Sequence, residues 1–384
     1  MVLQIMKSKP LLRATIQTLT PLLYKTPTFR RNPSSTYVDV YMKWKRDPLF
    51  ESIDTISLSP LMKPLLSLKN TISRHPNLRI PISSVSKRTK HFETPHRLKV
   101  ATFMRRYPSF FHESSHDTIP WFSLTRAASA LDIEERALLR ASRADIARRV
   151  YRLLRMSRDN HLPLSAIKGL QWNLGFPDEL LEDPIGFSDG LLEPDRDGLR
   201  ATTTDEPLRP MVSDAAFPLF PMKGVRLKRK IEEWLEEFQR VPYVSPYEDF
   251  SHVRPDSDVG EKRVVGVLHE LLGLFVDHSV ERRRLFGLKK PLGLPQKVHR
   301  VFERHPLMFY LSFKNTTCTV ILKEAYSDEG SKIERHPLNN LRRKYVELMK
   351  ESSEMLKARQ RRRCGGEAVM DEQSEVLEDQ ILNS

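Results

Sequence analysis

The stretch from Pro295 to Tyr326 constrains the fold more than any other, because it joins one amphipathic segment directly to two β-rich runs. Its apolar or aromatic side chains recur at the i, i+3, i+4 and i+7 spacing of one helix face, at Val298, Val301, Phe302 and His305. Its cations fall on the opposite face, at Lys297, Arg300 and Arg304. Pro306 ends the predicted helix, since proline has no amide hydrogen to donate and restricts the residue before it. The stretch therefore predicts a short helix that buries Phe302 on one side and presents cations on the other.

Two β-rich runs follow this helix, over Met308–Phe313 and Thr317–Lys323, and the segment Lys314–Thr316 joins them as the loop of a hairpin. In winged-helix domains the same order sets a basic helix and its hairpin against a phosphate backbone. A helix packed on a hairpin, with its polar face merely in solvent, has the same sequence pattern. On this unit alone, both interpretations stay open.

The chain repeats this plan between Thr94 and Thr125. When Pro108 is aligned with Pro306, the residues on the buried helix face are Val100, Phe103, Met104 and Tyr107. The same alignment matches Lys99 with Lys297 and Arg106 with Arg304. Two strand-like runs follow, at Phe110-Phe111 and at Trp121-Phe122. A repeated helix-plus-hairpin plan indicates duplication of one unit, and a weaker echo of it ends at Arg74-His75-Pro76.

The charge of the chain is both large and uneven. The 384 residues carry a formal net charge of +14 at pH 7, which favours an anionic partner. The segment from Lys69 to Arg106 has ten Lys or Arg and one acidic residue, and the segment from Arg282 to Arg304 has eight and one. Between them, the segment from Asp178 to Asp214 has eleven acidic residues and three Arg. Two basic blocks separated by an acidic one indicate a designated binding face, although a solvated face without function has the same composition.

Residues 1–38 contain six Lys or Arg and no Asp or Glu, with leucines and hydroxyl residues between them. This acid-poor, amphipathic composition is typical of an organelle transit peptide, which is removed and takes no part in the fold. Serine is scarce before Ser34, which favours the mitochondrion, with the chloroplast as the alternative. At the other end of the chain, residues 351–384 form a cluster of cations followed by a run of acids, and we expect a disordered charged tail.

Two further basic segments are candidates for contact with nucleic acid. The run Lys43-Trp44-Lys45-Arg46 places an aromatic ring among cations, which suits base stacking and phosphate contact. A tryptophan that anchors the first helix to the core explains the run equally well. The segment Ile82–Lys90 is predicted to be a short helix whose basic end includes Lys87 and Arg88.

The remaining chain is mostly helical by periodicity. Helices are expected over Leu61–Arg74, Leu131–Met156, Leu162–Leu174, Val225–Phe238, Val264–Val276 and Leu338–Leu356. From about residue 183 to residue 220 the periodicity disappears while Pro, Asp and Gly accumulate. We interpret this stretch as a long acidic irregular loop or as a degraded hairpin.

Five short motifs, taken in this order, resemble the plant organelle RNA recognition (PORR) domain family. They are Lys45-Arg46-Asp47-Pro48, Phe103-Met104-Arg105-Arg106-Tyr107-Pro108 with Phe110-Phe111, Leu162-Pro163-Leu164, Leu174-Gly175-Phe176-Pro177-Asp178, and Arg304-His305-Pro306 through Lys314. The resemblance covers roughly residues 37–350. It implies a nuclear-encoded organellar protein that binds group II intron RNA and promotes its splicing. The acidic run after Asp178 departs from the family pattern, which usually has another helix and strand pair there.

Catalytic chemistry has no candidate residues in the sequence. The chain has no Gly-x-x-x-x-Gly-Lys-Ser/Thr phosphate loop, no spacing of His and Cys that suits a metal, and only the cysteines Cys318 and Cys364. No apolar run approaches the length of a membrane span. We therefore expect no enzyme activity, no cofactor and no metal. The expected function is that of an RNA chaperone that clamps the splicing-competent fold of organellar intron RNA, and other splicing factors are further candidate partners.

The expected architecture is α+β and predominantly helical, with two to three helix-plus-hairpin (winged-helix-like) units packed together. The RNA-binding domain is expected to span residues 39–350. The expected RNA-binding residues are Lys43, Trp44, Lys45, Arg46, Lys87, Arg88, Lys99, Arg105, Arg106, Lys297, Arg300, Arg304 and Lys314. The alternative is a protein–protein scaffold in an organellar ribonucleoprotein, whose basic blocks contact an acidic partner and touch RNA little.

Overall fold

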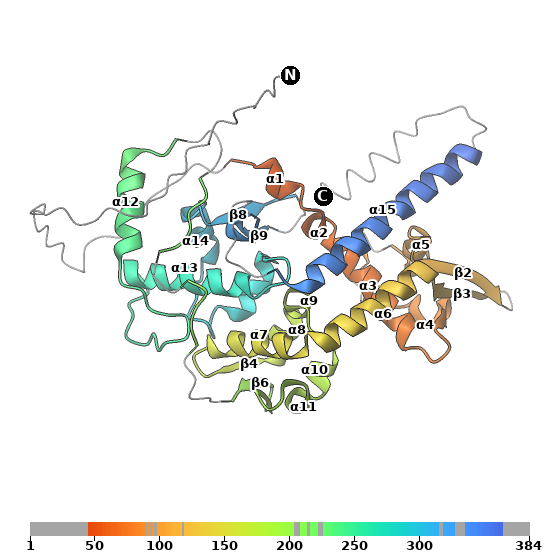
Figure 1. Cartoon of the computed structure of the whole chain (residues 1–384), viewed down its shortest axis with the longest axis horizontal. Coiled ribbons are helices and arrows are strands. Elements are labelled where there is room, and N and C mark those ends of the chain that lie inside the picture. The colour runs from red at the N-terminus through yellow and green to blue at the C-terminus, as the bar shows by residue number, and fades with distance from the viewer. Residues whose placement is uncertain are drawn as a thin grey trace, which may run out of the picture. The chain divides into compact units, whose positions relative to one another are not determined.

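The computed structural model describes residues 45–88, 91–92, 94–95, 98–116, 119–202, 208–212, 216–221, 226–314, 318–326 and 335–363. The expected transit peptide, Lys43, Trp44 and the chain after Arg363 lie outside the described residues. Within them the fold is α+β, with many helices around three small antiparallel sheets (Figure 1). The predicted fold class is thus confirmed.

Each sheet has three strands, and the strand order is the same in all three. The first sheet contains β1 (Arg79–Pro81), β3 (Ile119–Leu124) and β2 (Phe111–His116), in that order. The second contains β4 (His161–Pro163), β6 (Gly198–Ala201) and β5 (Leu192–Asp195). The third contains β7 (Ser279–Glu281), β9 (Thr319–Leu322) and β8 (Phe309–Ser312). The chain therefore builds one three-stranded plan three times, in units that span residues 59–124, 143–201 and 258–322.

The same turn leads into the first strand of each unit. It follows α3 (Ser59–Arg74), α7 (Arg143–Arg155) and α13 (Asp258–Gly273). The residue before each strand has a left-handed backbone, with φ of 50° at Leu78, 51° at Asn160 and 47° at His278. The amide of each donates to the carbonyl three residues earlier, and two residues later comes a buried apolar residue, namely Ile80, Leu162 or Val280. These matched positions fix the alignment of the three units.

Short helices link the first strand of each unit to its hairpin. In the first unit they are α4 (Ile82–Val85) and α5 (Val100–Arg105). In the third unit they are the 3-10 helix η2 (Arg282–Leu288) and α14 (Val298–Arg304). After α5 and α14 the amides of Phe110 and Met308 close equivalent turns onto the carbonyls of Tyr107 and His305. The two predicted hairpins are therefore confirmed, and so is the alignment of the two units that sets Pro108 on Pro306.

The middle unit has its own helices and hairpin, so of the two interpretations of residues 183–220 the hairpin, and not the loop, describes the chain up to Ala201, while the described residues 208–212 and 216–220 form no helix or strand. Its helices are α8 (Leu164–Gly169), α9 (Gln171–Leu174), α10 (Glu179–Glu182) and α11 (Pro184–Ser188). Gly175 ends α9 with φ of 70°, a left-handed conformation that glycine adopts without strain. The amide of Leu191 then closes the same turn onto Ser188, and β5 and β6 form the hairpin. Strands of three or four residues that contain Pro, Gly and Asp give little periodic signal, so the sequence pattern missed them.

The other elements connect and cover these units. They are α1 (Pro48–Glu51), α2 (Asp54–Ser57), α6 (Arg126–Ala141), α12 (Arg229–Arg240), η3 (Lys323–Tyr326) and α15 (Pro337–Arg363). The single helix expected over Leu131–Met156 is two helices, since α6 ends before Ser142 and α7 begins after it. Helix α15 continues to Arg363, so the first residues of the expected disordered tail are helical. The good helix formers Glu, Leu, Lys, Ala, Gln and Arg after residue 351 favour this extension.

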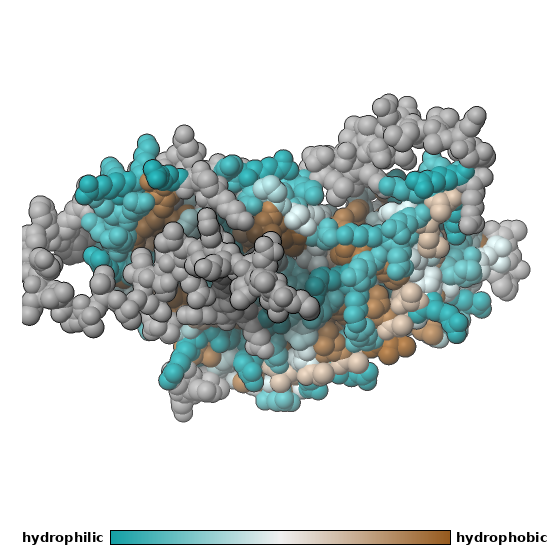
Figure 2. Space-filling view, turned by 45° about the horizontal axis from the view of Figure 1, so that its top comes forward, coloured by the Kyte–Doolittle hydropathy of each residue, from teal (hydrophilic) through white to brown (hydrophobic). Residues whose placement is uncertain are grey.

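Buried apolar residues form two large clusters. One joins the second and third units and includes Leu154, Leu199, Leu268, Phe302 and Val320. The other belongs to the first unit and takes in α15 through Tyr345, whose ring stacks on Phe110 at 6.0 Å between centroids. In the view of Figure 2, hydrophilic residues cover much of the surface, with hydrophobic strips between them. Helix α15 therefore belongs to the core of the fold along much of its length.

Candidate nucleic-acid interface

Helix α14 of the third unit presents two of its three predicted cations to solvent. Lys297, at its N-cap, and Arg300 are both exposed. On the opposite side, Val298 and Phe302 are buried, and the Phe302 ring meets Phe309 edge-on at 5.2 Å between centroids. The predicted apolar face of this helix is thus confirmed, and Lys297 and Arg300 remain candidates for phosphate contact.

Arg304 is buried, which corrects its placement on the solvent face. Its side chain is 7% exposed, and its Nε and Nη2 donate to the carboxylate of Glu261 at 2.7 and 3.0 Å. Its guanidinium also lies over the ring of Trp234, at 5.4 Å from the centroid. Helices α12 and α13 supply these partners and cover the end of α14. Arg304 therefore stabilises the packing of three helices and is not presented to an external phosphate.

Burial also sets the protonation of this cluster. Burial alone would raise the pKa of Glu261, but hydrogen bonds from His305 and Arg304 outweigh it and lower that pKa. The Glu261 carboxylate is therefore charged and satisfied at neutral pH. His305, on the predicted apolar face, is 1% exposed and contacts the rings of Trp234 and Phe238. Its role is structural, as the sequence pattern indicated.

Helix α5 of the first unit keeps its cations in solvent. Lys99 and Arg106 are exposed, while Phe103 and Met104 beneath them are buried. Arg105 is exposed as well, but its Nε and Nη2 donate to both oxygens of the Glu113 carboxylate, at 2.8 and 2.6 Å. The hydrogen bond from Arg105 lowers the pKa of Glu113. Two of the N–H donors of Arg105 are therefore already bonded to a carboxylate that competes with a phosphate for this side chain.

The basic end of α4 lies beside α5. Lys87 and Arg88 are exposed in the turn after α4, and α4 packs against α5. Residues 86–99 separate the two helices in the sequence. The fold therefore gathers Lys87, Arg88 and Lys99 into one basic region of the first unit. Figure 1 shows α5 and α14 well apart, so the first and third units offer two separate basic sites.

The N-terminal motif joins the third unit. Asp47 caps α1 through the amide of Leu49, and the Phe50 ring stacks on Tyr310 of β8 at 4.7 Å between centroids. Lys314, in the hairpin loop, places its Nζ 3.5 Å from the carbonyl oxygen of Glu51. Lys45 and Arg46 are exposed just before this helix. The fold therefore brings three predicted cations, Lys45, Arg46 and Lys314, to the two ends of one docked helix.

The middle unit lacks cations at the positions that carry them in its neighbours. The three units are aligned by setting Ser188 of the middle unit on Tyr107 and His305 of its neighbours. In this alignment Asp183 takes the place of Arg300 in α14. Leu180 takes the place of Lys99 and Lys297. Asp183 instead caps α11 by accepting from the amide of Gly186. The middle unit therefore contributes packing to the fold, and its hairpin helix is neutral to acidic.

The structure adds residues that the sequence analysis did not single out. A hollow of about 420 Å³ lies between η2 and α14, and Arg282, Phe286 and Lys289 line it from the η2 side. Phe286 is 54% exposed. The only signal in the sequence was the dense block of cations from Arg282 to Arg304, because an isolated Phe in a short helix looks like a core residue.

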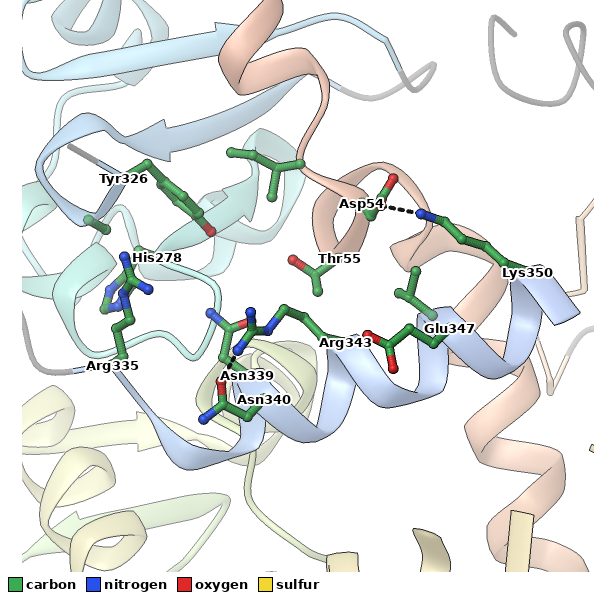
Figure 3. Close-up of a pocket in the computed structure, with 13 residues that line it drawn as sticks. Asp54, Thr55, His278, Tyr326, Arg335, Asn339, Asn340, Arg343, Glu347 and Lys350 are labelled. Carbon is green, nitrogen blue, oxygen red and sulfur yellow. Dashed lines mark hydrogen bonds and ion pairs between the residues drawn. The ribbon is translucent and has the colours of Figure 1, made fainter. Parts of the chain in front are cut away.

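A second hollow, of about 290 Å³, lies between α2, η3 and α15 (Figure 3). His278 lies at one side of it, close to Arg335. Two of its cations have partners within the hollow, since Lys350 pairs with Asp54 at 2.6 Å and Arg343 bonds to Asn340. Its lining also includes two acidic residues, Asp54 and Glu347, whereas the lining of the hollow at η2 includes none.

The described ranges of the chain bear on metal binding, membrane crossing and cysteine chemistry. These ranges contain no cluster of three His, Cys, Asp or Glu that could hold a metal. None of their helices is both long and apolar enough to cross a membrane. Burial raises the pKa of the Cys318 thiol, which disfavours the nucleophilic thiolate.

Comparison with known proteins agrees with this arrangement. The model of the plant organelle RNA recognition domain matches residues 45–189 and 198–354, which include the first and third units whole and the middle unit except residues 190–197. The mitochondrial protein WHAT'S THIS FACTOR 9 of Arabidopsis thaliana is 49% identical over 346 residues, which are 84% of this chain and 89% of that protein. The chloroplastic WHAT'S THIS FACTOR 1 of Zea mays is 26% identical over 80% of this chain and 67% of its own length.

Identity to a mitochondrial relative confirms the mitochondrial assignment, and the chloroplastic relative corresponds to the alternative. No solved structure matches the chain. The family match covers most of the described residues and includes the five motifs that carry the resemblance. The chain belongs to the plant organelle RNA recognition domain family.

Proposed function

We propose that this protein binds group II intron RNA in mitochondria and promotes its splicing as a chaperone, without catalysing a reaction. The observation that carries the proposal is the distribution of exposed cations on the hairpin helices. They stand on α5 and α14 of the outer units, at Lys99, Arg106, Lys297 and Arg300, and are missing from the equivalent helix of the middle unit. Two separated basic sites suit a ligand that is large, folded and lined with phosphates.

The mechanism follows from electrostatics and mass action. Lys and Arg that neutralise phosphates release condensed counterions, so the affinity for RNA falls steeply as salt rises. Two sites on one folded domain engage together only when the RNA brings the matching phosphates to the right separation. Preferential binding of that RNA fold raises its population without ATP. The family match to an RNA recognition domain supports RNA as the partner.

The test is a filter-binding titration of the full chain against a mitochondrial group II intron transcript, between about 50 and 200 mM salt. We expect the logarithm of the affinity to fall linearly with the logarithm of the salt concentration. Replacing both Lys297 and Arg300 with Gln should lower the slope by about 1.4 to 1.8, since each phosphate contact contributes about 0.7 to 0.9. The melting temperature should stay near that of the wild type, because both side chains are exposed.

The control replaces Lys228 and Lys230 with Gln, which removes the same charge from exposed positions at α12, outside the hairpin helices. It should leave the slope close to the wild-type value. Equal losses in both double variants would show that only net charge matters and would remove the assignment to α14. Wild-type protein that fails to bind RNA but captures an acidic splicing protein would favour the scaffold alternative.

A further inference from the structure

The hollow between η2 and α14 has the size of a small-ligand site, and its lining is more polar than is usual for one. Its volume of about 420 Å³ falls within the roughly 300–1,000 Å³ of pockets that take small molecules. Besides Phe286, the side chains that reach it include Arg282, Lys289, Gln296 and His299. None of its lining residues is acidic. The lining therefore suits a ligand that is planar, polar at its edges and negatively charged.

Phe286 is held in place although its ring is in solvent. The residues next to it in η2, Leu285 and Leu288, are 1% and 0% exposed and anchor the short helix in the core. The Nζ of Lys289 lies 4.3 Å from the centroid of the Phe286 ring and donates to the carbonyl oxygen of Gln296 at 2.7 Å. Lys289 thus fixes one side of the ring by a cation–π contact, and 54% of Phe286 stays exposed.

An aromatic ring in this setting is a feature of the third unit alone. Counted from the buried residue of the first strand, the positions equivalent to Phe286 hold Ser86 in the first unit and Lys168 in the second. An exposed phenyl ring contributes nothing to the core, and its apolar surface is costly to leave in water. The exposed ring belongs to the unit whose helix α14 also presents Lys297 and Arg300.

We propose that this hollow binds one unpaired RNA base, stacked on the free face of Phe286, with the flanking phosphates on the cations of η2 and α14. The proposal rests on the proposed function, since it specifies how bound RNA is contacted. Bases in duplex RNA are stacked inside a narrow groove and cannot reach a ring on the protein surface, so the site selects single-stranded or bulged nucleotides. Gln296 and His299 also line the hollow, and we assign to them the hydrogen bonds to the edge of the base.

The experiment uses the full chain and a single-stranded RNA 12-mer with one 2-aminopurine, whose fluorescence falls when the base stacks. Wild-type protein should quench the fluorescence and bind the 12-mer more tightly than a fully paired duplex of the same sequence. Phe286→Ala should abolish the quenching and weaken binding by about 5- to 100-fold, whereas Phe286→Trp should keep both. The salt slope should not change, because no charge is removed.

The control is Ile133→Ala, which shortens an apolar side chain that is 67% exposed on α6. It should leave affinity and quenching unchanged. If the wild type binds RNA but Phe286→Ala binds and quenches equally well, the stacking site is wrong while the proposed function stands. If the wild type binds neither the 12-mer nor intron RNA, the stacking site and the proposed function are both wrong. If polyglutamate binding, and not RNA binding, depends on Phe286, the hollow serves a protein partner and the stacking proposal is overturned.

Discussion

Arg304 holds Glu261 with two parallel hydrogen bonds, from Nε to Oε1 at 2.7 Å and from Nη2 to Oε2 at 3.0 Å. Both side chains are less than a tenth exposed. The pair joins the hairpin helix of the third unit to the first helix of the same unit. A residue that looks like one more cation in a basic helix is therefore part of the core, and this distinction can be tested.

We expect Arg304→Gln to destabilise the protein by about 3–5 kcal/mol, because it leaves the Glu261 carboxylate buried and poorly compensated. Arg300→Gln, four residues earlier on the exposed side of α14, is the matched control and should change stability by less than about 0.5 kcal/mol. Urea denaturation of both variants measures the difference. Equal stability of the two would mean that Arg304 contributes nothing to the packing of α14.

Phe302 gives the complementary test of the apolar face. It is 1% exposed and contacts Phe309. Phe302→Ala should cost about 3–5 kcal/mol through the lost burial and the cavity that remains. Thermal unfolding at neutral pH measures this loss of stability. A drop smaller than about 1 kcal/mol would contradict the placement of Phe302 in the core.

Leu78 is the one residue of the three matched turns that suits its backbone poorly. Its φ of 50° is close to the φ of Asn160 and of His278, so all three residues have a left-handed backbone. Leucine, however, lacks the short polar side chain that tolerates this conformation. Leu78 is also 62% exposed, so its removal loses little packing. Leu78→Asn should therefore stabilise the protein by about 1 kcal/mol, measured by the urea midpoint.

The control for this variant is Leu49→Asn, at a residue that is 51% exposed in helix α1. The same change of side chain there should bring no gain, since leucine favours helical backbone more than asparagine does. A stabilisation of equal size at both positions would show that the backbone angle at Leu78 is not the cause.

His278 should make stability depend on pH in mildly acidic solution. Burial lowers its pKa to about 4 from 6.5. Between these values the unfolded chain binds the proton and the folded chain does not, so stability is lost as pH falls through this window. His278→Asn keeps a residue that tolerates the left-handed backbone and should reduce the slope by up to about 1.4 kcal/mol per pH unit.

The measurement is the free energy of unfolding between pH 4 and pH 7, with His252→Asn, at an exposed histidine, as the control. The control should retain the wild-type slope. Carboxylates such as Glu261 add to acid unfolding in all three proteins and cancel in the comparison. An unchanged slope in His278→Asn would mean that other groups account for the whole pH dependence.

Local periodicity predicted the parts of the fold that local chemistry determines. The buried faces of α5 and α14 and the hairpins after Pro108 and Pro306 follow from the spacing of a few apolar residues and from proline's missing amide hydrogen. The net charge predicted only that the partner is an anion. The resemblance to a known family identified that partner as RNA.

The errors have a common physical cause in contacts between distant segments. Arg304 is buried because α12 and α13 place Trp234 and Glu261 over it, and nothing near residue 304 indicates this. The strands β5 and β6 form because Leu192 and Leu199 pack in the shared core, although their neighbours are charged or turn-forming residues. The exposure of Phe286 likewise depends on how η2 meets α14.

The last prediction concerns Arg105, the predicted RNA contact that already has a partner. Glu113 accepts two hydrogen bonds from it, and both side chains are largely in solvent, so the pair contributes at most about 1 kcal/mol to stability. Glu113→Gln removes a negative charge from the edge of the first unit's basic site and frees the guanidinium. If α5 contacts RNA, this variant should bind intron RNA more tightly and raise the log–log salt slope by about 0.7 to 0.9, one additional phosphate contact.

Glu134→Gln is the matched control, because it frees Lys344 from an equally exposed pair that joins α6 to α15, away from the hairpin helices. It makes the same change in net charge and should leave the slope near the wild-type value. A gain in Glu113→Gln alone would assign phosphate contact to the first unit. Equal gains in both variants would reduce the effect to net charge. No gain in either would restrict RNA binding to the third unit, where Lys297 and Arg300 form no ion pair with a carboxylate of the described residues.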